Sequence, residues 1–253
     1  MLSQISDFID AKALLSVMFG AVLAHVLHVG KVTRAEKIRE INCINAGITT
    51  AANICELAIM SKKQAFLPIF TKYEQQNHKL DHVYAAHYEQ KSSFRIEAEI
   101  DLKKIQNIET PISHLRALIY EKVNATTRVI SLVNFLADSL VSLNASIDYL
   151  NEQSAHLADL DKSQHNLAVE KYFGRTSSDG NTDTSYPDTL QQISLALDST
   201  IFFSKKVCEE MEKMGTKISK TIWLNRPTVE ETDFSREELK ELLPEEAEFT
   251  SWQ

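Results

Sequence analysis

The chain has 253 residues, of which 43% are hydrophobic and 25% are charged, so wholesale disorder is excluded and one or two packed domains are expected. It contains only 6 Gly and 5 Pro, and this scarcity of turn residues argues against a β-rich or α/β fold and predicts an all-α protein. The net charge is -8 and no large excess of clustered Lys and Arg occurs, so we expect no nucleic-acid partner.

An apolar run of 18 residues, 13–30, follows a short polar lead-in, 1–12. A bilayer core of about 30 Å needs about 20 mostly apolar helical residues, so we predict a transmembrane helix over 13–30, near the lower limit of length. His25 and His28 oppose insertion, but they lie near the end of the run, where polar side chains reach the interface. The side chains expected to form the anchor are Leu14, Leu15, Val17, Phe19, Val22, Leu23, Val26 and Leu27.

Four basic residues, Lys31, Arg34, Lys37 and Arg39, come directly after this run, whereas acidic residues precede it. The positive-inside rule therefore predicts a single-pass protein with its N-terminus outside and its C-terminal part in the cytoplasm. The same cluster is a candidate contact for anionic lipid headgroups, although we favour the simpler interpretation that it only sets the topology. The acidic lead-in argues against a cleaved signal peptide; a buried helix or membrane-active hairpin of a soluble protein stays open.

Residues 31–64 are predicted to continue the helix as a juxtamembrane segment, because apolar and small residues recur at helical spacing. Gly47 and Ala51 lie four residues apart and would allow another helix to approach closely. Pro68 predicts a bend or a helix boundary near residues 64–67.

Residues 65–173 are predicted to be a long helical, coiled-coil-like body. Its first part contains weak metal-ligand candidates, His78 and His82, which a helix would present on one face. A metalloprotease helix would need Glu after the first His, where Lys79 stands, and His87 would lie on the opposite side. We therefore expect a solvent-facing helix with neither metal nor cofactor.

In the longest pattern in the body, apolar residues recur alternately three and four positions apart, which is close to 3.5 residues on average. This spacing predicts a left-handed supercoil or an antiparallel bundle. Residues 112–173 lack Gly and Pro, which fits one rod or a hairpin equally well. The residues of this predicted packing seam are Ile105, Ile108, Ile112, Leu115, Ile119, Val129, Val133, Leu136, Leu140, Leu143, Ile147 and Leu150.

Three further segments complete the chain: a flexible polar loop over 174–187, a packing helix over 188–225 and an acidic tail over 226–253. The tail holds nine acidic and three basic residues, and a capping-box pattern predicts a short helix over 236–243. It is expected to be solvated, or else to act as a docking peptide that uses its leucines, Phe249 and Trp252.

No nucleotide-binding, hydrolase or zinc-protease motif occurs, and Cys43, Cys55 and Cys208 show neither a disulfide framework nor zinc spacing. We therefore expect a non-enzymatic, membrane-anchored protein that acts by self-association or by binding another helical protein, with the lipid bilayer as its other partner. The alternative is a pore-forming or membrane-active effector whose residues 13–30 are sheltered in a soluble bundle. A helical enzyme or metal site invisible in the sequence is the remote alternative.

Overall fold

The structure, a computed structural model, describes residues 2–90, 98–161, 164–177 and 180–252, without the side chains of 2–15, 83–90, 251 and 252. It is an all-α bundle, as predicted. The helices are α1 (Leu2–Ser61), α2 (Leu67–Gln90), α3 (Ile112–Glu121), α4 (Thr127–Ala158), α5 (His165–Phe173) and α6 (Ser185–Lys220). In the described ranges, the only extended pairing is an isolated bridge between Thr176 and Thr182.

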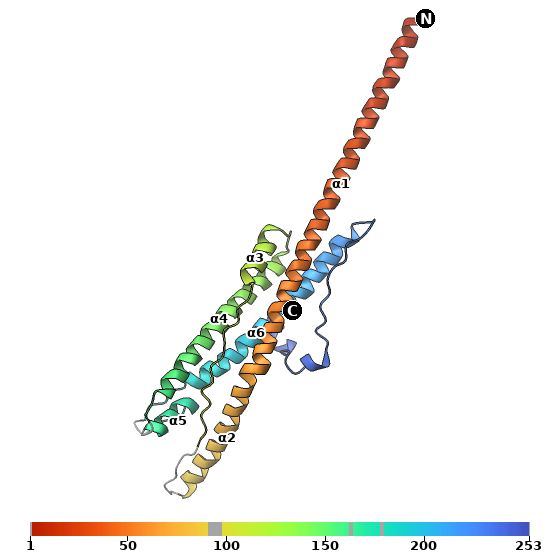
Figure 1. Cartoon of the computed structure of the whole chain (residues 1–253). Helices are drawn as coiled ribbons and strands as arrows, with labels where there is room; N and C mark the ends of the chain where they lie inside the picture. The colour runs from red at the N-terminus through yellow and green to blue at the C-terminus, as the bar shows by residue number, and fades with distance from the viewer. Residues whose placement is uncertain (1, 91–97, 162–163, 178–179, 253) are drawn as a thin grey trace.

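Helix α6 packs against both α1 and α4 and runs antiparallel to each of them (Figure 1). The direction follows from the contacts, because residue numbers rise along α1 and α4 as they fall along α6. These contacts are Ile48 with Cys208, Cys55 with Ile201, Arg128 with Glu210 and Phe135 with Phe203. The predicted antiparallel bundle is therefore confirmed for these three long helices.

Two glycines allow α1 and α6 to approach closely. A Cβ atom added to Gly47 would lie 2.3 Å from Cε of Met211, and one added to Gly215 would lie 3.1 Å from Cγ2 of Ile44. A larger side chain at Gly47 would displace the flexible end of Met211, and one at Gly215 would crowd Ile44 of α1 and Val229 of the tail. The small residue noted in the sequence at position 47 thus faces α6.

At the helix boundary expected before Pro68, the chain changes from α-helix to a π-helical turn. Residues Lys62–Phe66 form a π-helical turn, in which the N–H of Leu67 donates to the carbonyl of Lys62, and α2 continues directly from it. Proline lacks an N–H and its ring crowds the preceding turn, and a wider π turn tolerates both effects. The chain therefore stays helical from α1 into α2.

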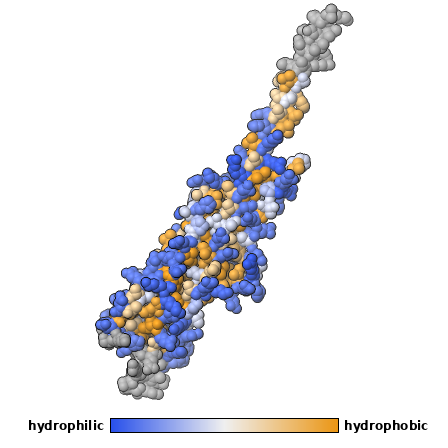
Figure 2. All heavy atoms as spheres, viewed as in Figure 1, coloured by the Kyte–Doolittle hydropathy of each residue, from blue (hydrophilic) through white to orange (hydrophobic). Residues whose placement is uncertain are grey.

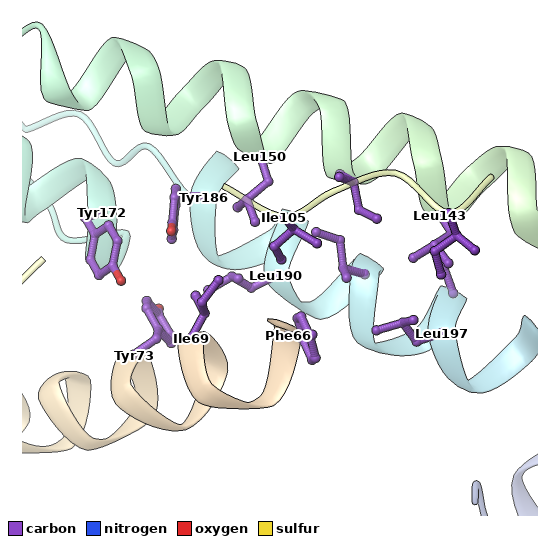
Figure 3. Close-up of a cluster of buried hydrophobic side chains, with 14 of the residues drawn as sticks. Phe66, Ile69, Tyr73, Ile105, Leu143, Leu150, Tyr172, Tyr186, Leu190 and Leu197 are labelled. Atoms are coloured by element: carbon purple, nitrogen blue, oxygen red, sulfur yellow. The ribbon is translucent and has the colours of Figure 1, made fainter. Parts of the chain in front are cut away.

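The prediction that Ile105 and Ile108 belong to a helix is wrong. The described residues 98–111 are not helical, and Pro111 is the N-cap of α3. Two asparagines of α4, Asn144 and Asn151, bond to the backbone N–H and carbonyl groups of Ile108 and Ile105, which replaces the bonds that a helix would supply. Both isoleucines still point into the core, and Figure 3 shows Ile105 between α4 and α6.

Residues 112–173 form neither a single rod nor one long hairpin. Helix α3 ends in a turn at residues 122–126, α4 follows it, and α5 is separate. Thr126 caps α4, since its hydroxyl accepts a hydrogen bond from the N–H of Val129. The turn lies where two polar residues, Lys122 and Thr126, interrupt the apolar register.

The C-terminal tail is not a solvated chain, because it packs along α1 and α6. Asn45 donates to the carbonyl of Thr228 and accepts from the N–H of Glu230, Leu242 is buried, and Phe249 stacks on Phe202 at 4.1 Å.

Two predicted boundaries in the C-terminal part also change. The predicted helix over 236–243 is only a 3-10 turn over Glu237–Leu239, because Ser235 donates its hydroxyl to Asp233 and makes no cap. The predicted loop over 174–187 ends at residue 184, since Pro187 fits into the first turn of α6.

Candidate membrane-facing site

The first half of α1 projects beyond the bundle (Figure 1). Described side chains are exposed from Ser16 to Glu36, and the first fully buried residue of the helix is Ile41. Figure 2 shows hydrophobic residues on this projecting helix, between its grey end and the bundle. An apolar surface that the bundle does not bury is therefore continuous with the packed core through one helix.

Two helical stretches of the described chain are long and apolar enough to cross a membrane by length and composition, Ser16–His82 and Thr127–Ala158. The apolar window of the second is 44% buried inside the bundle, as expected for a core helix. The window of the first is 0% buried. Burial by the protein therefore accounts for much of the apolar window of α4 but for none of the apolar window of α1.

The predicted anchor residues with described side chains are all exposed: Val17, Phe19, Val22, Leu23, Val26 and Leu27. The side chains of Leu14 and Leu15 lie outside the described ones. Exposed side chains of this size over several turns are unusual for a water-soluble surface and mark a site of membrane or protein contact.

The predicted lipid-flank residues lie where α1 enters the bundle. Lys31, Arg34 and Arg39 are exposed and Lys37 is half-buried. The guanidinium of Arg34 donates to the carbonyl of Leu224 over 3.0 Å, so one member of the cluster also holds a distant part of the chain.

That distant part is the turn after α6, which the sequence predicts only as the end of the packing helix over 188–225. Trp223 is 86% exposed and Leu224 is half-exposed, and both stand beside the basic cluster of α1. A groove of about 550 Å³ separates the turn from α1. The lining is apolar toward the anchor and basic toward the bundle, and it consists of Val26, Leu27, Gly30, Lys31, Thr33, Arg34, Lys37, Thr221, Ile222 and Trp223. The signal that the sequence offered was Trp223, which follows soon after the basic residues Lys217 and Lys220.

The weak metal candidates lie at the opposite end of the molecule. His78 and His82 are exposed on α2, with their ring centroids 4.6 Å apart. The neighbouring Asp81 is held by Arg175 at 2.6 Å. Among the described residues, no group of three or more His, Cys, Asp or Glu side chains is arranged to hold a metal ion. The side chain of His87 lies outside the described ones.

The residues of the predicted packing seam lie in the interior, although they come from three segments. Ile105 and Ile108 lie in the extended segment, Ile112, Leu115 and Ile119 in α3, and the others in α4. All are buried except Ile112, which is partly buried. Figure 3 shows Leu143 and Leu150 of α4 pointing toward Leu190 and Leu197 of α6.

The interior holds ionisable groups whose environment makes them unreactive. Burial raises the pKa of the Cys55 thiol to about 12 and raises that of Cys208 as well. Burial likewise raises the pKa of Tyr73, Tyr172 and Tyr186, which belong to α2, α5 and α6 and whose rings pack against one another. Neutral thiols and phenols in an apolar core are poor nucleophiles and poor bases, so they serve packing.

Comparison of the chain with known protein families, with curated proteins and with solved structures finds no match in any of the three.

Proposed function

We propose that this chain is a single-pass membrane protein whose helical bundle, on the cytoplasmic side, acts without turnover by binding a second copy or another helical protein. The observation that carries the proposal is the apolar window of α1, which has no burial inside the structure. Its exposure in water would be costly at about 25 cal/mol per Å² of apolar surface, and a bilayer removes that cost.

The continuity of α1 gives the anchor a mechanical role. One uninterrupted helix runs from Leu2 to Ser61 and contributes its second half to the core. At about 1.5 Å per residue, this helix is about 90 Å long, so the anchor and the bundle share one rigid axis. The bundle is therefore presented at a set distance from the membrane.

The orientation in this proposal places the basic cluster after the anchor in the cytoplasm. Lys31, Arg34 and Arg39 are exposed at the base of the bundle, where they face the surface of the membrane in this arrangement. The free thiols Cys43, Cys55 and Cys208 suit a reducing compartment.

Carbonate extraction of membranes from cells that express the chain tests the anchor. We expect the protein to stay in the membrane pellet. In sealed vesicles, added protease should digest a C-terminal tag when the cytoplasmic face is outward and should leave it intact when that face is inward. Leu23→Arg in the middle of the run should release a large fraction, because Arg at the centre of a span costs about 2.5–3.5 kcal/mol. Leu195→Arg is the matched control, since Leu195 is exposed on α6 in the bundle.

A wholly soluble, stable monomer would contradict the proposal and favour a membrane-active effector that shelters residues 13–30. Crosslinking of the membrane-bound full chain tests the partner role. We expect a crosslinked dimer or a crosslink to one helical protein, and only monomer at high surface density would count against self-association.

A further inference from the structure

The turn after α6 has a form that presents two apolar side chains outward. Asn225 has a positive φ of 48°, which reverses the chain directly after Trp223 and Leu224. Arg226 donates from Nε to the carbonyl of Ile222 over 3.0 Å, which closes the turn. The most exposed large hydrophobic residue among the described ones, Trp223, therefore stands at the tip of a well-bonded turn.

This turn lies beside the C-terminal end of the anchor, where α1 leaves the apolar run and enters the bundle. Arg34 holds the carbonyl of Leu224, and Arg34 is four residues, or about 6 Å along the helix, beyond Gly30. Trp223 also lines the groove that contains Val26 and Leu27, which belong to the last two turns of the apolar run. If α1 crosses the bilayer there, the Trp223 side chain is at the depth of the headgroups, where tryptophan is enriched in membrane proteins.

The charge of the surrounding surface suits a phosphate-rich layer. Residues 213–226 contain no acidic residue, and their basic side chains are Lys213, Lys217, Lys220 and Arg226. Lys213 pairs with Glu210 at 2.9 Å, and the groove that Lys217 and Lys220 line also contains Glu209, Glu212 and Glu231, so the positive charge is greatest where Lys220 and Arg226 approach α1. The cluster of α1 adds Lys31, Arg34 and Lys37 across the groove. Basic residues next to an anionic leaflet are attracted to it, whereas the acidic chain as a whole would be repelled.

We infer that the turn over residues 221–226 is a second membrane contact, in which Trp223 and Leu224 enter the interface of an anionic phospholipid leaflet and the groove beside Arg34 takes a lipid headgroup. The inference rests on the proposed anchoring by α1 and adds to it. A helix alone leaves its soluble part free to rotate about the helix axis. A second contact on α6 holds one face of the bundle against the membrane.

Fluorescence of Trp223 in the full chain tests this contact. Trp252 is the only other tryptophan, so Trp252→Phe leaves Trp223 as the sole reporter. The variant is reconstituted into vesicles of phosphatidylcholine and phosphatidylserine in equal parts, with and without bromine on the acyl chains. We expect the brominated lipid to quench about half of the Trp223 emission, as for a tryptophan at the interface.

A reporter at the far end of the bundle is the matched control. Tyr149 is exposed near the C-terminal end of α4, and Figure 1 shows that end of α4 at the end of the bundle away from the anchor. Tyr149→Trp, in a chain that also carries Trp223→Phe and Trp252→Phe, should therefore show almost no quenching. Lys217→Glu with Lys220→Glu should lower the quenching of Trp223 in these vesicles to the level found in pure phosphatidylcholine. Unchanged quenching in that variant would overturn the assignment to an anionic surface.

Vesicle flotation separates failure of this inference from failure of the anchor. A chain that floats and resists carbonate, with Trp223 no more quenched than the Tyr149→Trp reporter, overturns the second contact and leaves the anchor in place. A chain that does not float overturns both. Trp223 shielded from a soluble quencher in lipid-free detergent, together with crosslinks between copies at position 223, would assign the turn to a dimer interface and overturn the lipid contact.

Discussion

Asn144 and Ile108 are joined by a reciprocal pair of hydrogen bonds: the N–H of Ile108 donates to Oδ1 of Asn144 over 2.9 Å, and Nδ2 of Asn144 donates to the carbonyl of Ile108 over 3.1 Å. Asn151, two helical turns further along α4, binds Ile105 in the same way. These two side chains therefore hold the non-helical segment that contains Ile105 and Ile108 against α4.

Asn144→Ala should destabilise the bundle by about 2 kcal/mol, because it leaves a half-buried N–H and carbonyl without partners. Urea unfolding followed by the helical circular dichroism signal measures the change. Asn124→Ala is the matched control, since Asn124 has the same Asn-Ala-Ser/Thr context in an exposed turn. Equal stability of the two variants would show that the asparagine pair does not hold the segment.

Lys62 and Asp198 form an ion pair at the π turn, with Nζ 2.6 Å from Oδ1 and side chains only 11% and 19% exposed. Lys62→Met should cost about 2–3 kcal/mol, because it leaves Asp198 and the carbonyl of Leu242 without their donor. Adding Asp198→Leu should recover most of the loss, and thermal unfolding of the single and double variants measures both. A double variant as unstable as Lys62→Met would refute the explanation by an unpaired charge.

Gly47→Val should destabilise the contact between α1 and α6 by about 1–3 kcal/mol through overpacking against Met211. Met211→Ala in the same chain should restore part of the loss, because it makes room for the new side chain. Gly20→Val serves as the control, since a Cβ atom there meets nothing within 4 Å. Chemical unfolding in detergent tests the series, and an absence of coupling between positions 47 and 211 would contradict the predicted contact.

The buried thiol of Cys55 should make the bundle less stable in alkali. Its pKa is raised by burial from 9.0 to about 12, so between these values the unfolded chain loses a proton that the folded chain keeps. The stability contribution is complete below pH 9.0 and is lost as the pH rises toward about 12. At about pH 10.5 the loss from this group is about 2 kcal/mol.

Urea unfolding of the natural chain and of Cys55→Ala, at neutral and alkaline pH, isolates this effect from other titrating groups. The variant should show a smaller alkaline loss. Parallel slopes for the two chains would show that Cys55 ionises normally in the folded state.

Phe249 should keep the last part of the tail on the bundle, through its stacking on Phe202 and the ion pairs of nearby Glu246 with Lys205 and Lys206. Phe249→Ala should raise the rate of proteolytic cleavage within residues 244–252 several-fold while leaving the unfolding midpoint of the bundle nearly unchanged, because local release is a low-energy event. Thr250→Ala, at an exposed position, is the control, and equal cleavage rates would argue against this docking.

Helical content and the antiparallel packing of long helices could be read from composition and spacing. The scarcity of Gly and Pro and the near-3.5 register report local backbone preference and an apolar face, which act within a few turns. The apolar run over 13–30 and the basic cluster after it were also visible, since both depend on side-chain chemistry alone. The burial of Leu143 and Leu150 follows from the same pattern.

Other features needed contacts between segments far apart in the chain. The spacing of Ile105 and Ile108 fits a helix, but Asn144 and Asn151 supply a competing set of hydrogen bonds from another element. The tail looked solvated by its charge, yet α1 and α6 offer partners such as Asn45. No local pattern encodes these pairings.

The sequence by itself determined that the protein is helical, that one run is apolar enough for a membrane and that basic residues follow it, because these are sums over neighbouring residues. Only the tertiary structure decided that α4 hides much of its apolar window while α1 exposes its own, and that Trp223 stands beside Arg34. Burial and proximity depend on which helices pack together, and residues nearly 190 positions apart meet only when the chain has folded.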